Sequence, residues 1–152
     1  MKVNKSQVER FHCEIVELIK KYQFRDRNEM VCGGLSVSQC YVLETLHRQG
    51  TMSMQKLADR MHLSISTVTR VIEPLVKQKI VTREEDLSDH RVRLINLTPE
   101  GEKLYAESWD NVFTSEKVIL ENFPEDQREL LIDFLKKLNQ AFGNWKKGCP
   151  KV

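Results

Sequence analysis

The chain has 152 residues, of which 40% are hydrophobic and 30% charged, and its net charge is +2. A chain of this length buries about two-thirds of its unfolded surface without disulfides, so it suits one domain, or one domain with a helical extension. No apolar run is long enough to cross a bilayer and no signal-peptide pattern opens the sequence, which predicts a cytoplasmic protein. In that compartment the four cysteines are expected to be free thiols.

The first predicted helix covers residues 4–24. Its apolar side chains recur at helical spacing and form one stripe, with charged residues on the other face. Residues 25–34 have little apolar content and end in a pair of glycines, so they are predicted to be a linker. A second helix is expected from Ser36, its N-cap, to about Arg48, where Gly50 ends it.

Residues 53–98 begin with two short helices. The first starts near Ser53, and the second follows a tight connection at His62–Leu63. Two short helices joined so closely are typical of a helix-turn-helix. Five apolar residues of the second helix are expected to form one buried stripe, namely Ile65, Val68, Val71, Ile72 and Leu75. Two ordinary amphipathic helices of a small domain are the alternative, because the motif is degenerate.

The opposite face of the second helix has the composition of a DNA-reading surface. It carries Ser66, Arg70, Glu73 and Lys77, with Thr67 and Thr69 on its flanks. Small hydroxyls allow a helix to approach base edges and phosphates closely, and a guanidinium binds two acceptors of one guanine or a phosphate. Ser64 is predicted to be the N-cap, which would point the first amides of the helix outward to receive a phosphate.

Two strand-like segments follow, at residues 80–83 and 91–97, with a polar turn between them. Arg91 and Arg93 are predicted to share one face of the second strand, since side chains alternate along a strand. A two-stranded ribbon after a helix-turn-helix is a wing. At its tip, the Asp89 carboxylate is predicted to orient the Arg91 guanidinium before it meets a phosphate or enters a minor groove.

Two long helices complete the chain. Thr98 and Pro99 predict a helix start, because the hydroxyl caps the helix and proline suits its first position. Nothing breaks this helix before about Asn122, so it would span roughly 35 Å. A final helix is expected from Glu125 to Trp145. Helices of this length extend beyond a compact winged-helix core, so a second copy of the chain is expected to cover their apolar residues. A monomer whose outer helices pack on themselves is the alternative.

Three motifs in these segments resemble those of the MarR (multiple antibiotic resistance regulator) family. Residues 63–70 (LSISTVTR) are similar to its recognition helix, residues 89–91 (DHR) to its D-x-R wing, and residues 97–101 (LTPEG) to its L-T-x-x-G junction. They occur in the family's order and at its spacing. Two positions depart from the pattern. Pro74 is expected to bend the recognition helix, and Lys79 stands where many relatives have glycine.

The resemblance implies a mainly α chain with a small β-wing, a winged helix-turn-helix with N- and C-terminal dimerisation helices. Residues 1–34 would be the N-terminal dimerisation helix and linker, 35–98 the DNA-binding lobe, 99–145 the C-terminal dimerisation helices and 146–152 a tail. It implies a sequence-specific transcriptional regulator, usually a repressor, that binds a palindromic operator in double-stranded DNA as a homodimer. The resemblance also implies that a small ligand, a metal or a thiol modification could release the protein from DNA.

The resemblance and the polar face together name the residues expected to contact DNA. They are Ser64, Ser66, Thr67, Thr69, Arg70, Asp89, Arg91 and Arg93. The sequence has no phosphate-binding glycine loop, nucleophile elbow or metal-binding helix motif, so neither an enzyme nor a cofactor is predicted. A winged helix used only for protein–protein contact is the second alternative, since fold does not determine function. Such a module would not need hydroxyls and arginines together on one surface.

The cysteines supply a candidate effector or thiol site. Cys40, Glu44 and His47 share one helix face, and with Cys32 they could bind a soft or borderline metal ion. Cys32 and Cys40 could instead respond to an oxidant. Cys13 lies in the first helix, where some oxidant-sensing relatives in the family carry a reactive cysteine. The spacing matches no established zinc pattern, so no metal is predicted, and a small core residue is the stronger interpretation of Cys40.

Overall fold

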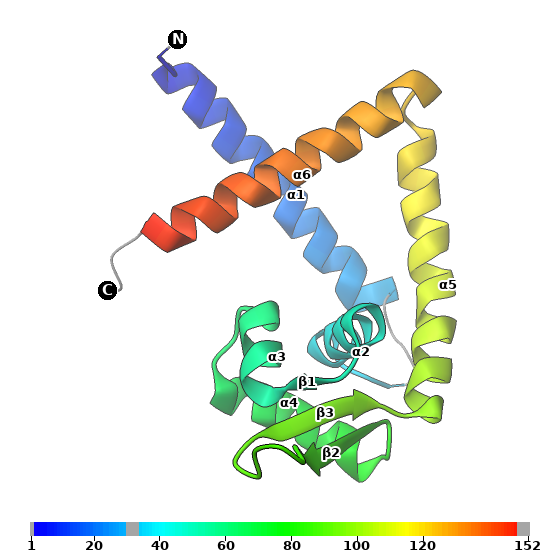
Figure 1. The fold of residues 1–152 in the computed structure, drawn as a ribbon. Helices are drawn as coiled ribbons and strands as arrows, with labels where there is room; N and C mark the ends of the chain where they lie inside the picture. The colour runs from blue at the N-terminus through cyan, green and yellow to red at the C-terminus, as the bar shows by residue number, and fades with distance from the viewer. Residues whose placement is uncertain (1, 30–33, 149–152) are drawn as a thin grey trace. The chain divides into compact units, whose positions relative to one another are not determined.

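The computed structural model describes residues 2–29 and 34–148 (Figure 1). Its elements in chain order are α1 (Lys5–Glu29), α2 (Val37–Gln49), β1 (Met52–Ser53), α3 (Met54–Met61), α4 (Ile65–Lys77), β2 (Val81–Glu85), β3 (Arg93–Leu97), α5 (Pro99–Glu121) and α6 (Glu125–Gly148). The mainly helical chain with its small wing confirms the predicted fold class. The chain divides inside α5 into two units, Met1–Val112 and Phe113–Val152. None of the helices in the described ranges has both the length and the apolarity of a membrane span.

The core of the first unit lies among α2, α3, α4 and a three-stranded sheet. The strand order is β1-β3-β2 with antiparallel pairs, so β3 is the central strand. The sequence analysis missed β1, because a two-residue strand is too short to show an alternating pattern. The largest fully buried side chains are Val42, Leu43, Leu57, Val68, Ile72, Leu75, Val81 and Ile95.

The helix-turn-helix is shaped by its caps. The predicted N-caps Ser36 and Ser64 are confirmed, since each hydroxyl accepts a hydrogen bond from the amide three residues later, at 3.3 and 3.2 Å. Ser53 caps α3 in the same way at 3.2 Å. At its other end α3 stops at His62, whose φ of 54° lies in the left-handed region. This reversal turns the chain into α4 within three residues, as the sequence predicted.

The predicted linker from residue 25 is wrong in its first part, because α1 continues to Glu29. Asp26 is only 5% exposed and pairs with the buried Arg25 guanidinium at 2.9 Å. Arg25 also stacks on Tyr22, 3.9 Å from its ring centre, and the Tyr41 hydroxyl of α2 donates to Asp26. Burial and this carboxylate raise the pKa of the Tyr41 hydroxyl. Contact with α2 thus buries two charged residues of a segment whose amino-acid composition alone indicates a loop.

The recognition-type helix α4 passes through Pro74 and ends in a left-handed turn. Lys79 adopts a φ of 57°. The amides of Lys79 and Ile80 donate back to the carbonyls of Val76 and Leu75, at 3.0 and 2.9 Å, which is the pattern of a Schellman motif. The lysine therefore takes the left-handed conformation that usually favours glycine.

The segment Leu97–Gly101 joins the wing to α5 and to the end of α4. The Thr98 hydroxyl lies 2.8 and 2.9 Å from the carbonyl oxygens of Lys79 and Ile80 and accepts from the Gly101 amide at 3.0 Å. The Thr98 amide also donates to the Ile80 carbonyl at 3.1 Å. A Cβ atom on Gly101 would lie 2.2 Å from that carbonyl oxygen and 2.7 Å from Leu97 Cδ1. Only glycine allows the two backbones to approach so closely.

Apolar side chains remain exposed on α1 of the first unit and on α6 of the second. On α1 they are Val8, Phe11, Leu18, Ile19 and Tyr22, and on α6 they are Leu130, Phe134, Leu135, Phe142 and Trp145. Exposed apolar surface of this extent usually marks an interaction site.

We expect Gly101→Ala to destabilise the protein by about 1–3 kcal/mol, because the added methyl group overlaps a backbone carbonyl that cannot rotate away. Urea denaturation followed by circular dichroism measures the change. Gly143→Ala in α6 is the matched control, since nothing lies within 4 Å of a Cβ atom there. This control should stabilise the helix by roughly 0.5–1 kcal/mol. Equal stability of Gly101→Ala and the wild type would show that α5 can move away from Ile80.

Candidate nucleic-acid interface

The first turn of α4 carries a connected set of hydroxyls. Ser64 Oγ lies 2.9 Å from Ser66 Oγ and 2.8 Å from Thr67 Oγ1, in addition to its bond with the Thr67 amide. The Thr69 hydroxyl donates to the Ile65 carbonyl at 2.8 Å. Most of the hydroxyls predicted to read DNA therefore already bond within the helix, which holds them in place and leaves them mainly as acceptors.

The predicted buried stripe of α4 is wrong at its first position. Val68, Ile72 and Leu75 are buried, but the Ile65 side chain is 47% exposed. Cα–Cβ bonds tilt toward the N-terminus of a helix, so a residue in the first turn projects beyond the turns that pack on the core. Ile65 therefore keeps the helix face of Val68 and Ile72 but extends past the core, whereas the exposed Arg70 lies on another face.

The wing differs from its prediction in register and extent. β2 begins at Val81 and runs to Glu85, which pairs with Arg93 across the ribbon. The two side chains also form an ion pair. Arg91 lies before β3 begins, so the predicted second strand starts too early, and the prediction that Arg91 and Arg93 share one face of that strand is wrong.

Carboxylates hold the backbone of the loop at the wing tip. Asp86 Oδ1 accepts from the amides of Ser88 and Asp89 at 2.7 and 3.3 Å. The Ser88 hydroxyl is the largest influence among those that keep the Asp86 pKa below its usual value. Asp89 Oδ1 accepts from the Arg91 amide at 3.0 Å. Asp89 thus orients the backbone of Arg91, whereas the sequence analysis expected it to orient the guanidinium.

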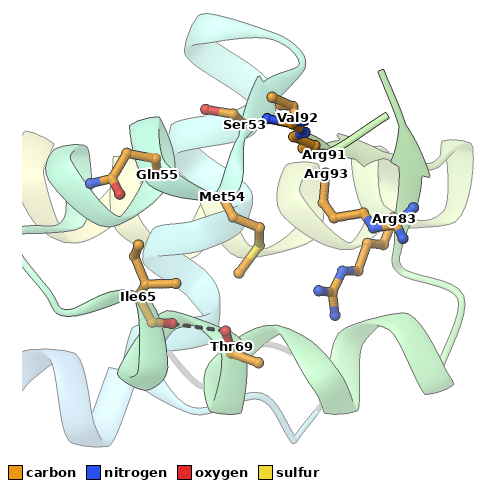
Figure 2. Close-up of a pocket in the computed structure, with 9 residues that line it drawn as sticks. All are labelled: Ser53, Met54, Gln55, Ile65, Thr69, Arg83, Arg91, Val92 and Arg93. Atoms are coloured by element: carbon orange, nitrogen blue, oxygen red, sulfur yellow. Dashed lines mark hydrogen bonds between the residues drawn. The ribbon is translucent and has the colours of Figure 1, made fainter. Parts of the chain in front are cut away.

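A hollow of about 290 Å³ lies between the helix-turn-helix and the wing (Figure 2). It is lined by Ser53, Met54, Gln55, Ile65, Thr69, Arg83, Arg91, Val92 and Arg93. Figure 2 shows the arginines on the wing side and Ile65, Thr69 and Gln55 on the helix side. The structure therefore brings together Thr69, Arg91 and Arg93 of the predicted set around one concave surface.

Arg83 was missed by the sequence analysis. It pairs with the fully buried Ile95, on the same face of the ribbon as the buried Val81. The alternation from Val81 was the available signal, since it places residue 83 on the face turned toward the helices. Arg93 is partly neutralised by Glu85. Among the residues that the structure describes, no carboxylate forms an ion pair with Arg83 or Arg91, so the wing side of the hollow is cationic.

The described residues of the candidate cysteine site do not form a metal-binding cluster. Cys40 belongs to the hydrophobic core, Glu44 pairs with Arg48 at 2.9 Å, and His47 Nδ1 lies 2.7 Å from Glu102. No three His, Cys, Asp or Glu side chains in the described part of the chain are placed to hold a metal ion. Cys13 is an exposed thiol on α1. Cys32 lies outside the described residues, so its pairing with Cys40 stays a prediction.

Comparison with known sequences agrees with this fold. A model of the MarR family matches residues 35–92, which run from the start of α2 to the wing loop. The HTH-type transcriptional regulator YxaD of Bacillus subtilis is 27% identical over 139 residues, covering 91% of this chain and 97% of the relative.

Two solved structures extend the likeness over nearly the whole chain. A MarR family protein from Bacillus stearothermophilus has a TM-score of 0.83 at 21% identity, covering 93% of this chain and 99% of that chain. The PcaV transcriptional regulator from Streptomyces coelicolor, in complex with its natural ligand, has a TM-score of 0.71 at 20% identity, with coverage of 93% and 99%. The family consists of transcriptional regulators rather than enzymes. With its winged helix-turn-helix, its three motifs and these matches, the chain belongs to the MarR family of DNA-binding transcriptional regulators.

Proposed function

We propose that this chain is a sequence-specific repressor that binds a palindromic operator as a homodimer. The observation that carries the proposal is the hollow between α4 and the wing, where a cationic wall faces a helix with hydroxyls and Arg70 on its exposed side. Double-stranded DNA presents phosphates and base-edge acceptors side by side, and this surface offers a complement to both.

In the proposed complex, α4 enters the major groove with its N-terminal turn. Ser64 caps the helix and its hydroxyl bonds to those of Ser66 and Thr67, so the three hydroxyls meet base edges as a rigid unit that mainly accepts hydrogen bonds. Thr69 lines the hollow with its hydroxyl turned back to its own helix. Arg70 is the exposed cation of this face and is our candidate for a bidentate contact with guanine.

The wing supplies the contacts to the DNA backbone. Arg91 follows a loop whose backbone is held by Asp86 and Asp89, so its position is set before DNA arrives. Arg83 and Arg91 provide the phosphate or minor-groove contacts. Arg93 supports them with a charge that Glu85 partly cancels.

The exposed apolar faces of α1 and α6 support a dimer. Burying such side chains against a second copy removes apolar surface from water, at roughly 25 cal/mol per Å². Dimeric helix-turn-helix proteins read half-sites about 34–36 Å apart, which is one turn of DNA. A dimer of this chain would therefore recognise a palindrome.

We also propose that an effector releases the DNA. PcaV has been solved with its natural ligand, and the chain shares its fold. A ligand that binds one spacing of the two DNA-binding lobes better than another shifts the population toward it. The exposed Cys13 is the described thiol open to modification, since Cys40 is buried. Titration of the DNA complex with phenolic acids, oxidants and metal ions tests each class.

Selection from a random duplex pool tests the proposed function. The wild-type protein should enrich a short palindrome, and its affinity should fall steeply between 50 and 200 mM salt, roughly 10³-fold or more for six or more phosphate contacts. Anisotropy titrations on the enriched duplex measure both. Weak binding without enrichment would favour a winged helix used for protein contacts.

We expect Arg70→Ala and Arg91→Ala to weaken DNA binding in different ways. Arg70→Ala should weaken binding of the enriched duplex by roughly 1–3 kcal/mol and relax its sequence preference at one position. Arg91→Ala should weaken all duplexes about equally and lower the salt slope by about one. Arg93→Ala is the matched control, with a smaller loss of affinity because Glu85 already neutralises part of the charge of that side chain. An unchanged sequence preference in Arg70→Ala would show that Arg70 does not contact a base.

Phe134→Asp should convert the dimer into a monomer. Its ring is 57% exposed on α6, and a carboxylate at that point of an apolar interface would be desolvated without a partner. Sedimentation velocity at micromolar concentration measures the change. Leu87→Asp, at a wing-loop side chain that is 94% exposed, should stay dimeric. A Phe134→Asp protein that sediments as a dimer would place the interface elsewhere.

A further inference from the structure

Ile65 is an exposed aliphatic side chain in the first turn of α4, the turn proposed to enter the major groove. It is the first residue of the helix, 47% exposed, and it lines the hollow beside Thr69 and Gln55 (Figure 2). We propose that Ile65 contacts the C5-methyl group of a thymine in the major groove and so contributes to sequence preference. The inference rests on the proposed function, in which α4 enters that groove.

The position of Ile65 favours a base contact. The N-terminal residues of recognition helices are those that reach base edges. Ile65 immediately follows the N-cap Ser64 and precedes the exposed Ser66. The core does not need its side chain, because Val68, Ile72 and Leu75 already fill the buried side of α4.

The neighbouring polar groups strengthen the case for an apolar contact. The Ser64 hydroxyl bonds to those of Ser66 and Thr67, and the Thr69 hydroxyl donates to the Ile65 carbonyl. These groups have little donor capacity left for base edges. Around the first turn of α4, Ile65 therefore presents chemistry that the hydroxyls do not supply.

The chemistry of the groove identifies the partner. Base pairs present hydrogen-bond donors and acceptors in the major groove, and the thymine methyl group is the apolar exception. Burying a methyl group contributes about 0.8 kcal/mol, which corresponds to roughly fourfold in affinity for one half-site. A dimer on a palindrome would make the contact twice.

Deoxyuridine substitution tests the contact, because it removes the thymine methyl group and keeps every hydrogen bond of the base pair. The probe is the duplex enriched from the random pool, with each thymine of one half-site replaced in turn. For the wild type we expect one replacement to lower the affinity about fourfold. Ile65→Ala changes both protomers, so it should bind the unmodified duplex about sixteenfold more weakly than the wild type does, and it should be insensitive to the replacement. The wild type should bind a duplex with that thymine replaced in both half-sites about as weakly.

Ile65→Val is the matched control, since it keeps a branched aliphatic group and should retain most of the sensitivity. Thermal unfolding of both variants should stay close to the wild type, because the side chain is half exposed. A wild type insensitive to every replacement would overturn the contact, as would a sensitivity that persists in Ile65→Ala. If the wild type enriches no duplex at all, the proposed function itself fails and the contact fails with it.

Discussion

The junction between α4, the wing and α5 depends on two residues, Thr98 and Gly101. The Thr98 hydroxyl lies within hydrogen-bond distance of the two carbonyls that follow α4 and accepts a hydrogen bond from the Gly101 amide in the first turn of α5. Gly101 lets the α5 backbone approach the Ile80 carbonyl at a distance that any side chain would prevent. Because β2 begins at the next residue, the angle between α4 and the wing depends on this junction. The hollow between them exists only while that angle is kept.

The interface divides its tasks among different chemical groups. Hydroxyls of the first turn of α4 cap and stiffen the helix, and the carboxylates of Asp86 and Asp89 fix the backbone of the wing loop. These contacts prepare the surface without using the guanidiniums. In the proposed complex Arg70, Arg83 and Arg91 contact DNA, and such binding would require little reordering of the protein. Glu85 moderates the charge of the wing through Arg93.

Local signals in the sequence predicted the helices and their caps well, because Ser36, Ser64 and Thr98 act on amides three residues away. Features that depend on distant partners could not be predicted in the same way. Arg25 and Asp26 are buried because Tyr41, fifteen residues later, reaches Asp26. Ile65 fits the apolar spacing of α4, but the buried part of that stripe begins only one turn later along the helix. Sequence spacing places both the Arg91 amide and the Arg91 guanidinium near the Asp89 carboxylate, and it does not decide which of the two donates to it.

We infer that α4 and the wing form one DNA-binding surface. Hydrogen–deuterium exchange of the full chain, with and without the enriched duplex, distinguishes a joint surface from contact by one element. We expect slower exchange in residues 64–70 and in the wing loop 86–92 together, with α6 unchanged. Protection that is confined to either segment alone, or that lies on α6, would contradict a joint surface.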